Sequence, residues 1–386
     1  MWWWLPACGD PPGNGPGVAV PVLDAPVFVV PGPGLPPEIA PQASNNNLAV
    51  TWHQGRRFFA WRTGPSHFAS AEVVMNVVSS EDDGNTWRFE GAFALGTDVR
   101  EPQLLSFEGR LWLYFAELGT SSIEFEPHGM KRTEYLGPGQ WTPLDDVYDD
   151  TFIPWRLRDV DGVPQLLGYV GGENVYDADG EPVRIHWLRA DDGMNWVPFQ
   201  GNDPIVHEGG GSETDLVFLD DGSIVAVIRN EAGEDGLFGS FVCTAPADDL
   251  MAWTCDPDPL KYDSPLMFRA SGRVWLVGRR NVTASGAYDL QLDGLEPQQE
   301  YLTYQLAYWQ EPKRCALWEV DPATRTVAWA LDLPSSGDTC FPDYLDLPDG
   351  SFELWNYTSP LDTPDLSWLE GQTGETAIYR IRLSFR

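Results

Sequence analysis

Short apolar runs that end at Gly, Asp or Pro recur along the chain, and few windows carry the 3.6-residue apolar period of a helix. One pattern occurs six times: a strand, a short turn that ends in glycine, and a second strand. The turn glycines are Gly55, Gly109, Gly162, Gly222, Gly272 and Gly350. Each copy predicts a β-hairpin, because glycine readily supplies the positive φ that such a turn requires.

The spacing of these hairpins predicts the architecture. Successive turn glycines lie about 50 to 80 residues apart, and a lone hairpin cannot bury both of its faces. Six of them, each extended by two further strands, predict an all-β fold: a six-bladed β-propeller of four-stranded antiparallel blades. An array of two or three β-sandwich domains is the alternative. The regular repeat over residues 44–386 favours the propeller.

The segment before the repeats differs in composition. Residues 9–43 are rich in Pro and Gly, which predicts an extended tether ahead of a propeller domain at 44–386. In residues 1–8, Leu5-Pro6-Ala7-Cys8 resembles a bacterial lipobox within a truncated signal-like segment. The resemblance implies lipidation of Cys8 and an extracytoplasmic protein, anchored at the cell surface or secreted. A frayed N-terminus with a chance cysteine is the alternative.

Four cysteines remain besides Cys8: Cys243, Cys255, Cys315 and Cys340. An even number suits an exported protein with disulfides, and three pairings are possible. Each close pair brackets neighbouring strands, which favours Cys243–Cys255 and Cys315–Cys340. The sequence contains no CxxC or HExxH motif, so we expect no metal and no other cofactor.

The formal charge of −34 limits the class of partner. Such a surface repels phosphate backbones and anionic lipid, so we expect no nucleic-acid partner and membrane contact only through a lipid anchor. No apolar run approaches the roughly 20 residues that span a bilayer. A soluble monomer is expected.

Two segments resemble the Asp box, a turn motif of sialidase-like propellers written S-x-D-x-G-x-T-W. Residues 80–87 (SEDDGNTW) match every specified position, and residues 189–196 keep the Asp, the Gly and the Trp. In the families that carry it, the box joins outer strands of a blade and its role is structural. The resemblance implies a sialidase-like propeller.

Aligning the six hairpins on their turn glycines yields a candidate site. The residues nine positions before and seven after each glycine lie at the open end of the hairpin, so they would gather at one mouth of the channel. The first set is Asn46, Arg100, Ile153, Glu213, Asp263 and Phe341, and the second is Arg62, Ala116, Tyr169, Arg229, Arg279 and Tyr357. Buried charges are costly unless they are paired or functional. This polar set therefore predicts a ligand-binding mouth, with Arg100–Glu213 and Arg229–Asp263 salt bridges between blades as the alternative.

One blade resembles a sialidase more closely. The stretch from Ser212-Glu213 to Arg229-Asn230 resembles the segment in which a Glu precedes a DG turn and an Arg follows it. The resemblance implies that Glu213 is an acid/base partner, that Arg229 and Arg279 bind a sugar carboxylate, and that Arg62 ends the second strand of the first blade.

The rest of the sialidase catalytic set diverges. Phe341 stands where the family has its nucleophilic Tyr, and no Arg lies near residues 45–47. His67 and Glu72 are the titratable residues of the loop that carries the family's acid Asp.

Together these patterns predict an exo-acting glycoside hydrolase, with an acidic sugar as one candidate substrate. Glu213 and Asp263 are the candidate catalytic carboxyl groups, with Glu101 and Glu231 in reserve, and Tyr357 is a candidate nucleophile. The candidate substrate-binding residues are Asn46, Arg62, Arg100, Glu101, Arg229 and Arg279. A non-catalytic glycan-binding lectin or adhesin on the same scaffold is the second hypothesis, and a lyase is the third.

Overall fold

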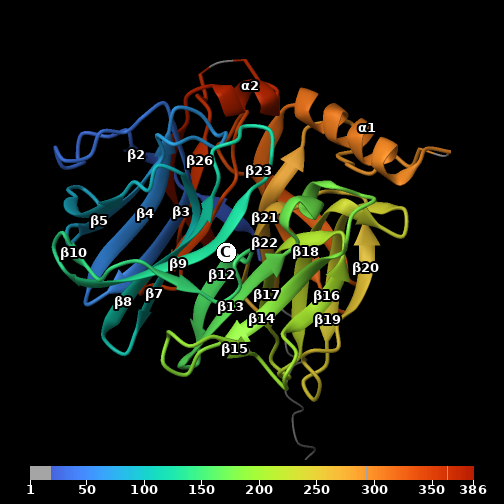
Figure 1. Cartoon of the computed structure of the whole chain (residues 1–386), viewed down its shortest axis with the longest axis horizontal. Helices are drawn as coiled ribbons and strands as arrows, with labels where there is room; N and C mark the ends of the chain where they lie inside the picture. Colours follow the sequence, from blue (N-terminus) through green and yellow to red (C-terminus); the bar gives the residue numbers. More distant parts are fainter. Residues whose placement is uncertain (1–18, 293, 363) are drawn as a thin grey trace, which may run out of the picture.

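The computed structural model describes residues 19–292, 294–362 and 364–386. Six antiparallel sheets are arranged as blades around a central channel, so the six-bladed propeller is confirmed (Figure 1). Each of the six hairpins forms the two inner strands of one blade. The six turn glycines have φ between +71° and +83°, as the hairpin pattern predicted.

Blades 1 to 3 follow one another along the first half of the chain. Blade 1 comprises β3 (Ser44–His53), β4 (Arg56–Gly64), β5 (Val74–Ser80) and β6 (Arg88–Phe93). Blade 2 comprises β7 (Asp98–Phe107), β8 (Arg110–Leu118), β9 (Pro127–Gly137) and β10 (Gln140–Trp141), with β11 (Asp145–Val147) also paired to β9. Blade 3 comprises β12 (Ile153–Val160), β13 (Val163–Val170), β14 (Val183–Arg189) and β15 (Val197–Pro198), with β16 (Ile205–Gly209) also paired to β14.

Blades 4 to 6 complete the ring. Blade 4 comprises β17 (Gly211–Phe218), β18 (Ile224–Glu234), β19 (Leu237–Ala245) and β20 (Thr254–Asp258). Blade 5 comprises β21 (Asp263–Ala270), β22 (Arg273–Asn281), β23 (Lys313–Asp321) and β24 (Thr326–Asp332). Blade 6 comprises β25 (Asp343–Asp346), β26 (Phe352–Thr358) and β27 (Ala377–Phe385).

The N-terminal segment completes blade 6. Strands β1 (Pro21–Leu23) and β2 (Val27–Val30) both pair antiparallel with β27. The predicted domain boundary at residue 44 was therefore wrong, because short apolar stretches inside the Pro/Gly-rich segment supply outer strands to the last blade. Cys8 and residues 1–18 lie outside the described residues, so lipidation stays a prediction.

Helices lie over one end of the ring (Figure 1). Helix α1 (Pro297–Gln310) belongs to an insertion between β22 and β23, and α2 (Trp368–Thr373) lies between β26 and β27. A short 3-10 helix, η1 (Gly172–Tyr176), follows β13. None of the helices in the described part of the chain is long and apolar enough to cross a membrane.

Turns and disulfides tie strands and blades together. In the turn between β5 and β6, Asp82 accepts hydrogen bonds from Ser80 Oγ and from the Thr86 backbone nitrogen, at 2.8 and 2.9 Å. Trp87 then packs against Trp355 of blade 6, with ring centroids 5.9 Å apart. Both predicted disulfides are present: Cys243–Cys255 joins β19 to β20, and Cys315–Cys340 joins blade 5 to the segment before β25.

Bulges interrupt the inner strands near their open ends. The pairing of β3, β7, β12, β17 and β21 with the following strand shifts register there. Asn47, Glu101 and Ser264, at three of these bulges, have φ of +39°, +54° and +55°. A bulge re-aims the side chains beside it, so these positions decide which residues face the channel.

Candidate active site

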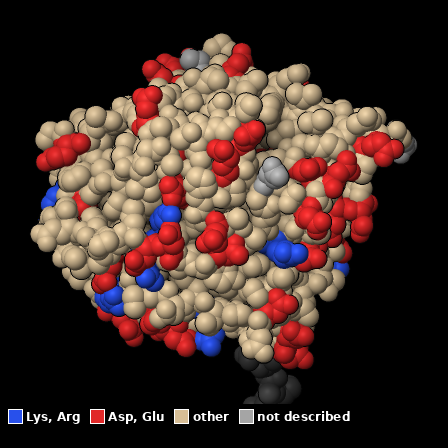
Figure 2. Space-filling view, viewed as in Figure 1, with Lys and Arg blue, Asp and Glu red and all other residues tan. Residues whose placement is uncertain are grey.

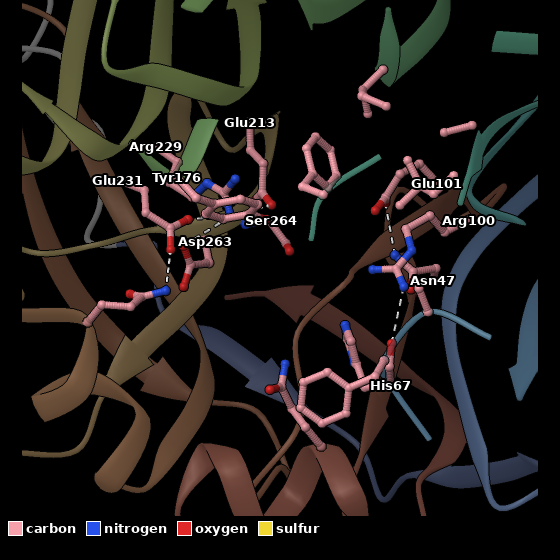
Figure 3. Close-up of a pocket in the computed structure, with 18 of the residues that line it drawn as sticks. Asn47, His67, Arg100, Glu101, Tyr176, Glu213, Arg229, Glu231, Asp263 and Ser264 are labelled. Atoms are coloured by element: carbon pink, nitrogen blue, oxygen red, sulfur yellow. Dashed lines mark hydrogen bonds and ion pairs between the residues drawn. The ribbon is translucent and has the colours of Figure 1, made fainter. Parts of the chain in front are cut away.

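A cavity of about 810 Å³ lies where the inner strands end beneath α1 and α2. Seven of the nine predicted catalytic and binding residues line it: Arg100, Glu101, Glu213, Arg229, Asp263, Arg279 and Tyr357. Figure 3 shows Glu213, Arg229, Glu231 and Asp263 on one side of the open space, and Asn47, Arg100 and Glu101 on the other. The alignment of hairpins thus brought together residues that are far apart in the sequence.

Asn46 and Arg62 do not line the cavity, and both side chains are fully buried. Arg62 Nε lies 2.8 Å from Asp98 Oδ1, and its Nη1 donates to Asn46 Oδ1 at 3.3 Å. The bulge after Asn46 turns the next residue, Asn47, toward the cavity instead. Direct substrate contact by Asn46 and Arg62 finds no support in this placement.

Arg229 lies at the centre of the charges contributed by blades 4 and 5. Its Nη1 lies 2.7 Å from Glu213 Oε1, 3.0 Å from Glu231 Oε2 and 3.9 Å from Asp263 Oδ1. Arg100 forms its ion pair with Asp98 rather than with Glu213. Of the two salt bridges in the alternative interpretation, Arg100–Glu213 is therefore wrong, because Asp98, two residues earlier on β7, pairs with Arg100, whereas Arg229 and Asp263 do lie within ion-pair distance.

Asp263 is almost fully buried and has several donors. Arg279 Nη1 lies 3.0 Å from Asp263 Oδ2, Lys261 Nζ lies 3.5 Å from Oδ1, and the Tyr308 hydroxyl donates to Oδ2 at 2.5 Å. Burial alone would raise the pKa of Asp263, but the nearby Lys261, Arg279 and Arg229 outweigh it and lower this pKa. Asp263 is therefore an anion that fixes Arg279 and α1.

Glu213 reaches the cavity from the bulge in β17. Arg229 binds one of its oxygens, and the Ser264 backbone nitrogen donates to the other at 2.6 Å. Burial raises the pKa of Glu213, whereas Arg229 opposes that rise. Both oxygens thus have a donor, which fixes the orientation of the carboxyl group.

Glu101 faces the cavity from blade 2 and is 8% exposed. Asn47 Nδ2 donates to Glu101 Oε2 at 2.9 Å. Burial raises the pKa of Glu101 to about 7, with Arg100 opposing the rise and the charge of Glu213 adding to it. The Glu101 carboxyl group therefore keeps its proton over a wider pH range than an exposed glutamate.

Several residues of the site lie outside the hairpin repeat. Lys261 Nζ pairs with Glu231 Oε1 at 3.0 Å, and Gln305 Nε2 donates to the same oxygen at 2.6 Å. Gln305 and Tyr308 come from α1, an insertion that the repeat pattern could not reveal. Lys261 could have been suspected, because it lies two residues before Asp263, one of the aligned positions.

Hydroxyl groups supply uncharged polar atoms to the cavity wall. Tyr169, Tyr176 and Tyr301 all line it, and their hydroxyls form no hydrogen bond with any described residue. An aromatic ring with a polar tip can pack against a sugar face and bind its hydroxyl groups.

Acidic side chains outnumber basic ones in the cavity wall as well as outside it. Four basic side chains of the wall (Arg100, Arg229, Lys261 and Arg279) accompany six acidic ones (Glu101, Glu124, Glu126, Glu213, Glu231 and Asp263). Acidic side chains predominate on the face of the molecule shown in Figure 2, in line with the net charge of −34. Across the described ranges, no group of three or more His, Cys, Asp or Glu residues is placed to hold a metal ion.

Tyr357 and His67 meet at a buried carboxylate. The Tyr357 hydroxyl donates to Asp338 Oδ1 at 2.9 Å, and His67 Nδ1 lies 2.7 Å from Asp338 Oδ2. Burial raises the pKa of Tyr357, which disfavours the phenolate that a nucleophile requires. This placement supports a role for Tyr357 in holding Asp338.

No family model matches the sequence, and no curated protein matches it either. Solved structures share the fold. A protein of unknown function from Dyadobacter fermentans has a TM-score of 0.57 at 13% identity, over 89% of this chain and 95% of that one. Trypanosoma rangeli sialidase in complex with the inhibitor DANA has a TM-score of 0.54 at 12% identity, over 88% of this chain and 55% of that one.

A third match is an endo-arabinase from Bacteroides thetaiotaomicron, with a TM-score of 0.41 at 16% identity, over 61% of this chain and 88% of that one. The match with the sialidase covers 55% of that chain, so this chain spans about half the length of the sialidase. At these identities the two matches with TM-scores above 0.5 show the propeller fold alone, so function has to be argued from the site.

Proposed function

We propose that the protein is an exo-acting glycoside hydrolase whose site is the cavity beneath α1 and α2. The observation that carries the proposal is the pair Glu101 and Glu213, two buried carboxyl groups that reach one cavity from different blades (Figure 3). Glycoside hydrolysis commonly uses two carboxyl groups at the scissile bond. Burial raises the pKa of both groups, but Glu213 is ion-paired with Arg229 whereas Glu101 accepts from the uncharged amide of Asn47, so Glu213 is the better anion and Glu101 the better acid.

Glu101 is the proton donor in this proposal. Its pKa of about 7 leaves a large fraction of the group protonated near neutral pH. Glu213 is the anionic partner, because the ion pair with Arg229 opposes the rise in its pKa and the Ser264 backbone nitrogen donates to its second oxygen. A carboxylate at that place stabilises the positive charge that develops on the sugar ring.

The pairing of the cations favours an uncharged sugar. Arg100, Arg229 and Arg279 each already bind a carboxylate of the protein, so none of them has its full charge available for a substrate carboxylate. The hydroxyls of Tyr169, Tyr176 and Tyr301 instead provide partners for sugar hydroxyls. We therefore favour a neutral sugar over the acidic one that the sialidase resemblance implied.

Arg156 lies across the channel and supports an exo-acting enzyme, which removes sugars from the end of a glycan. Arg156, on β12, donates to the backbone oxygens of Pro265 and Pro342 at 2.9 and 3.0 Å and so links blade 3 to blades 5 and 6. Trp155, Ser264 and Phe341, which neighbour these residues, line the cavity. A glycan that enters from the helix-covered end cannot thread past Arg156, so the end of a glycan is the part that fits.

Turnover of a panel of 4-nitrophenyl glycosides and oligosaccharides tests the proposal. We expect the wild type to release a terminal sugar, and Glu101→Gln and Glu213→Gln to lose about 100-fold or more of kcat while still binding it. Glu208→Gln is the matched control, since Glu208 pairs with Arg184 at the surface. Sugar binding without any turnover would instead establish the lectin hypothesis, and an unsaturated product would establish a lyase.

Two disulfides support an extracytoplasmic location. Lipidation of Cys8 belongs to the same proposal, and mass spectrometry of the protein purified from the native membrane fraction tests it. Unmodified Cys8 in the mature protein would contradict the anchor.

A further inference from the structure

The loop between β4 and β5 fixes a histidine in the cavity wall. Arg62 donates to the backbone oxygens of Ser66 and Phe68, at 3.1 and 2.9 Å, on either side of His67. Arg100 Nη2 donates to the backbone oxygen of His67 itself at 3.2 Å. These contacts hold the loop in one conformation, and the side chain of His67 lines the cavity.

Asp338 sets the tautomer of this histidine. The Asp338 carboxylate is fully buried, and His67 Nδ1 and the Tyr357 hydroxyl approach its two oxygens at 2.7 and 2.9 Å. Burial alone would raise the pKa of Asp338, but His67, Arg279 and Tyr357 together lower it, so this group is an anion and only accepts. The proton shared with His67 therefore resides on Nδ1, and Nε2 carries the lone pair.

Nε2 of His67 is available to a ligand. It forms no hydrogen bond with any described residue, and it is open to the cavity. The charged groups that face His67 are Asp338, Arg62 and Arg100, and Tyr357 lies with its ring centroid 6.3 Å away. Burial lowers the pKa of His67, with Asp338 opposing, which keeps the ring neutral at neutral pH.

We propose that His67, oriented by Asp338, is the general base that activates water in the hydrolysis proposed above, on which this inference rests. Nε2 takes one proton from water as the water oxygen bonds to the anomeric carbon. The bond to the leaving oxygen breaks with its electron pair, and Glu101 gives that oxygen a proton. His67 ends as the imidazolium and Glu101 as the carboxylate, and proton exchange with solvent restores both.

His67 fits this role better than Glu213 does. One oxygen of Glu213 is ion-paired with Arg229 and the other accepts from the Ser264 backbone nitrogen, whereas Nε2 of His67 has a free lone pair. Because water attacks directly, the configuration at the anomeric carbon inverts. Asp338 is a positioning residue, as it acts through His67.

Proton NMR of the first sugar product tests the stereochemistry with whichever 4-nitrophenyl glycoside the wild type hydrolyses. Inversion is expected, and a retained configuration overturns the inference. His67→Gln should lose about 100-fold of kcat with KM changed by less than about threefold. His207→Gln is the matched control, since His207 Nε2 lies 2.8 Å from Glu234 outside the cavity. Loss of activity in Glu101→Gln but not in His67→Gln would refute this inference and leave the proposed function intact.

A second measurement decides the inference without turnover. Nitrogen-15 NMR of the histidine rings in the folded wild type should show His67 neutral at pH 7, with its proton on Nδ1. A proton on Nε2, or a doubly protonated ring, overturns the proposal even if no glycoside is hydrolysed. Asp338→Asn should shift the acidic limb of the pH–rate profile, which a purely structural role for Asp338 would leave in place.

Discussion

The hydroxyl of Tyr308, on α1, donates a 2.5 Å hydrogen bond to the carboxylate of Asp263 at the start of β21. The bond connects an insertion outside the propeller repeat to an inner strand that lines the channel. Helix α1 is thereby part of the cavity wall, and its position depends on the charge state of a residue on blade 5.

Tyr308→Phe should therefore lower the free energy of unfolding, because it removes the hydroxyl that donates to Asp263 while keeping the buried aromatic ring. Loss of a hydrogen bond to a charged group costs about 1.5 to 3 kcal/mol, and the pKa of Asp263 should rise because a donor is gone. Chemical denaturation measures the first effect. Tyr148→Phe, which removes a bond to His186 instead, is the control and should cost about 1 kcal/mol or less.

Glu101 should make stability depend on pH. Its folded pKa of about 7 exceeds the ordinary value of 4.5, so between these values the native state holds a proton that the unfolded state has released. Stability contributed by this group is then present at low pH and falls as pH rises from about 4.5 to 7. Glu101→Gln should be more stable than the wild type at pH 8 by about 3 kcal/mol, and equal to it near pH 4. Equal stability at both pH values would contradict the buried carboxyl.

Arg156→Leu should be strongly destabilising. The substitution leaves the backbone oxygens of Ser264, Pro265 and Pro342 without the donor they share. Unsatisfied buried acceptors cost about 1 to 3 kcal/mol each, so we expect a loss of at least about 3 kcal/mol in thermal or chemical unfolding. Arg158→Leu removes a less buried arginine from the same strand and should cost less.

The two disulfides should contribute unequally. Cys315–Cys340 encloses a separation of 25 residues and joins two blades, whereas Cys243–Cys255 encloses 12 within one blade. Chain-entropy arguments give about 3 kcal/mol for loops of this size, with more for the longer one. Arg279 also donates to the backbone oxygen of Thr339 at 2.7 Å, beside Cys340. Replacing Cys315 and Cys340 by Ser should lower both the melting temperature and the activity, while the other pair should affect the melting temperature alone.

The inner strands and the residues at equivalent positions on them could be predicted from the sequence, because both follow from a local pattern that is repeated six times. Six glycine turns located the inner strands, and equivalent positions on those strands placed Glu213, Asp263 and Arg279 at one mouth. The bulges were invisible to the alignment, because they depend on how blades pack, and they exchange Asn46 for Asn47 as a wall residue.

Residues that lie between repeats could not be placed in the same way. Asp338 belongs to the segment before β25, and Tyr308 to a helix inserted into blade 5. Their partners are set by tertiary contacts over 271 residues for Asp338 and 45 for Tyr308. The strands within residues 21–30 were hidden by the surrounding Pro and Gly.

Pairing of β1 and β2 with β27 couples the two ends of the chain. Strands β1 and β2 precede all the other described strands in the sequence, yet they have no partner until β27 has been made, so blade 6 is completed only when β27 is present. His67 follows β4 of blade 1 and Asp338 precedes β25 of blade 6, so their contact joins the two blades on either side of this closure. A chain that is cut between Tyr357 and β27 thus carries every catalytic candidate but lacks the strand that completes blade 6.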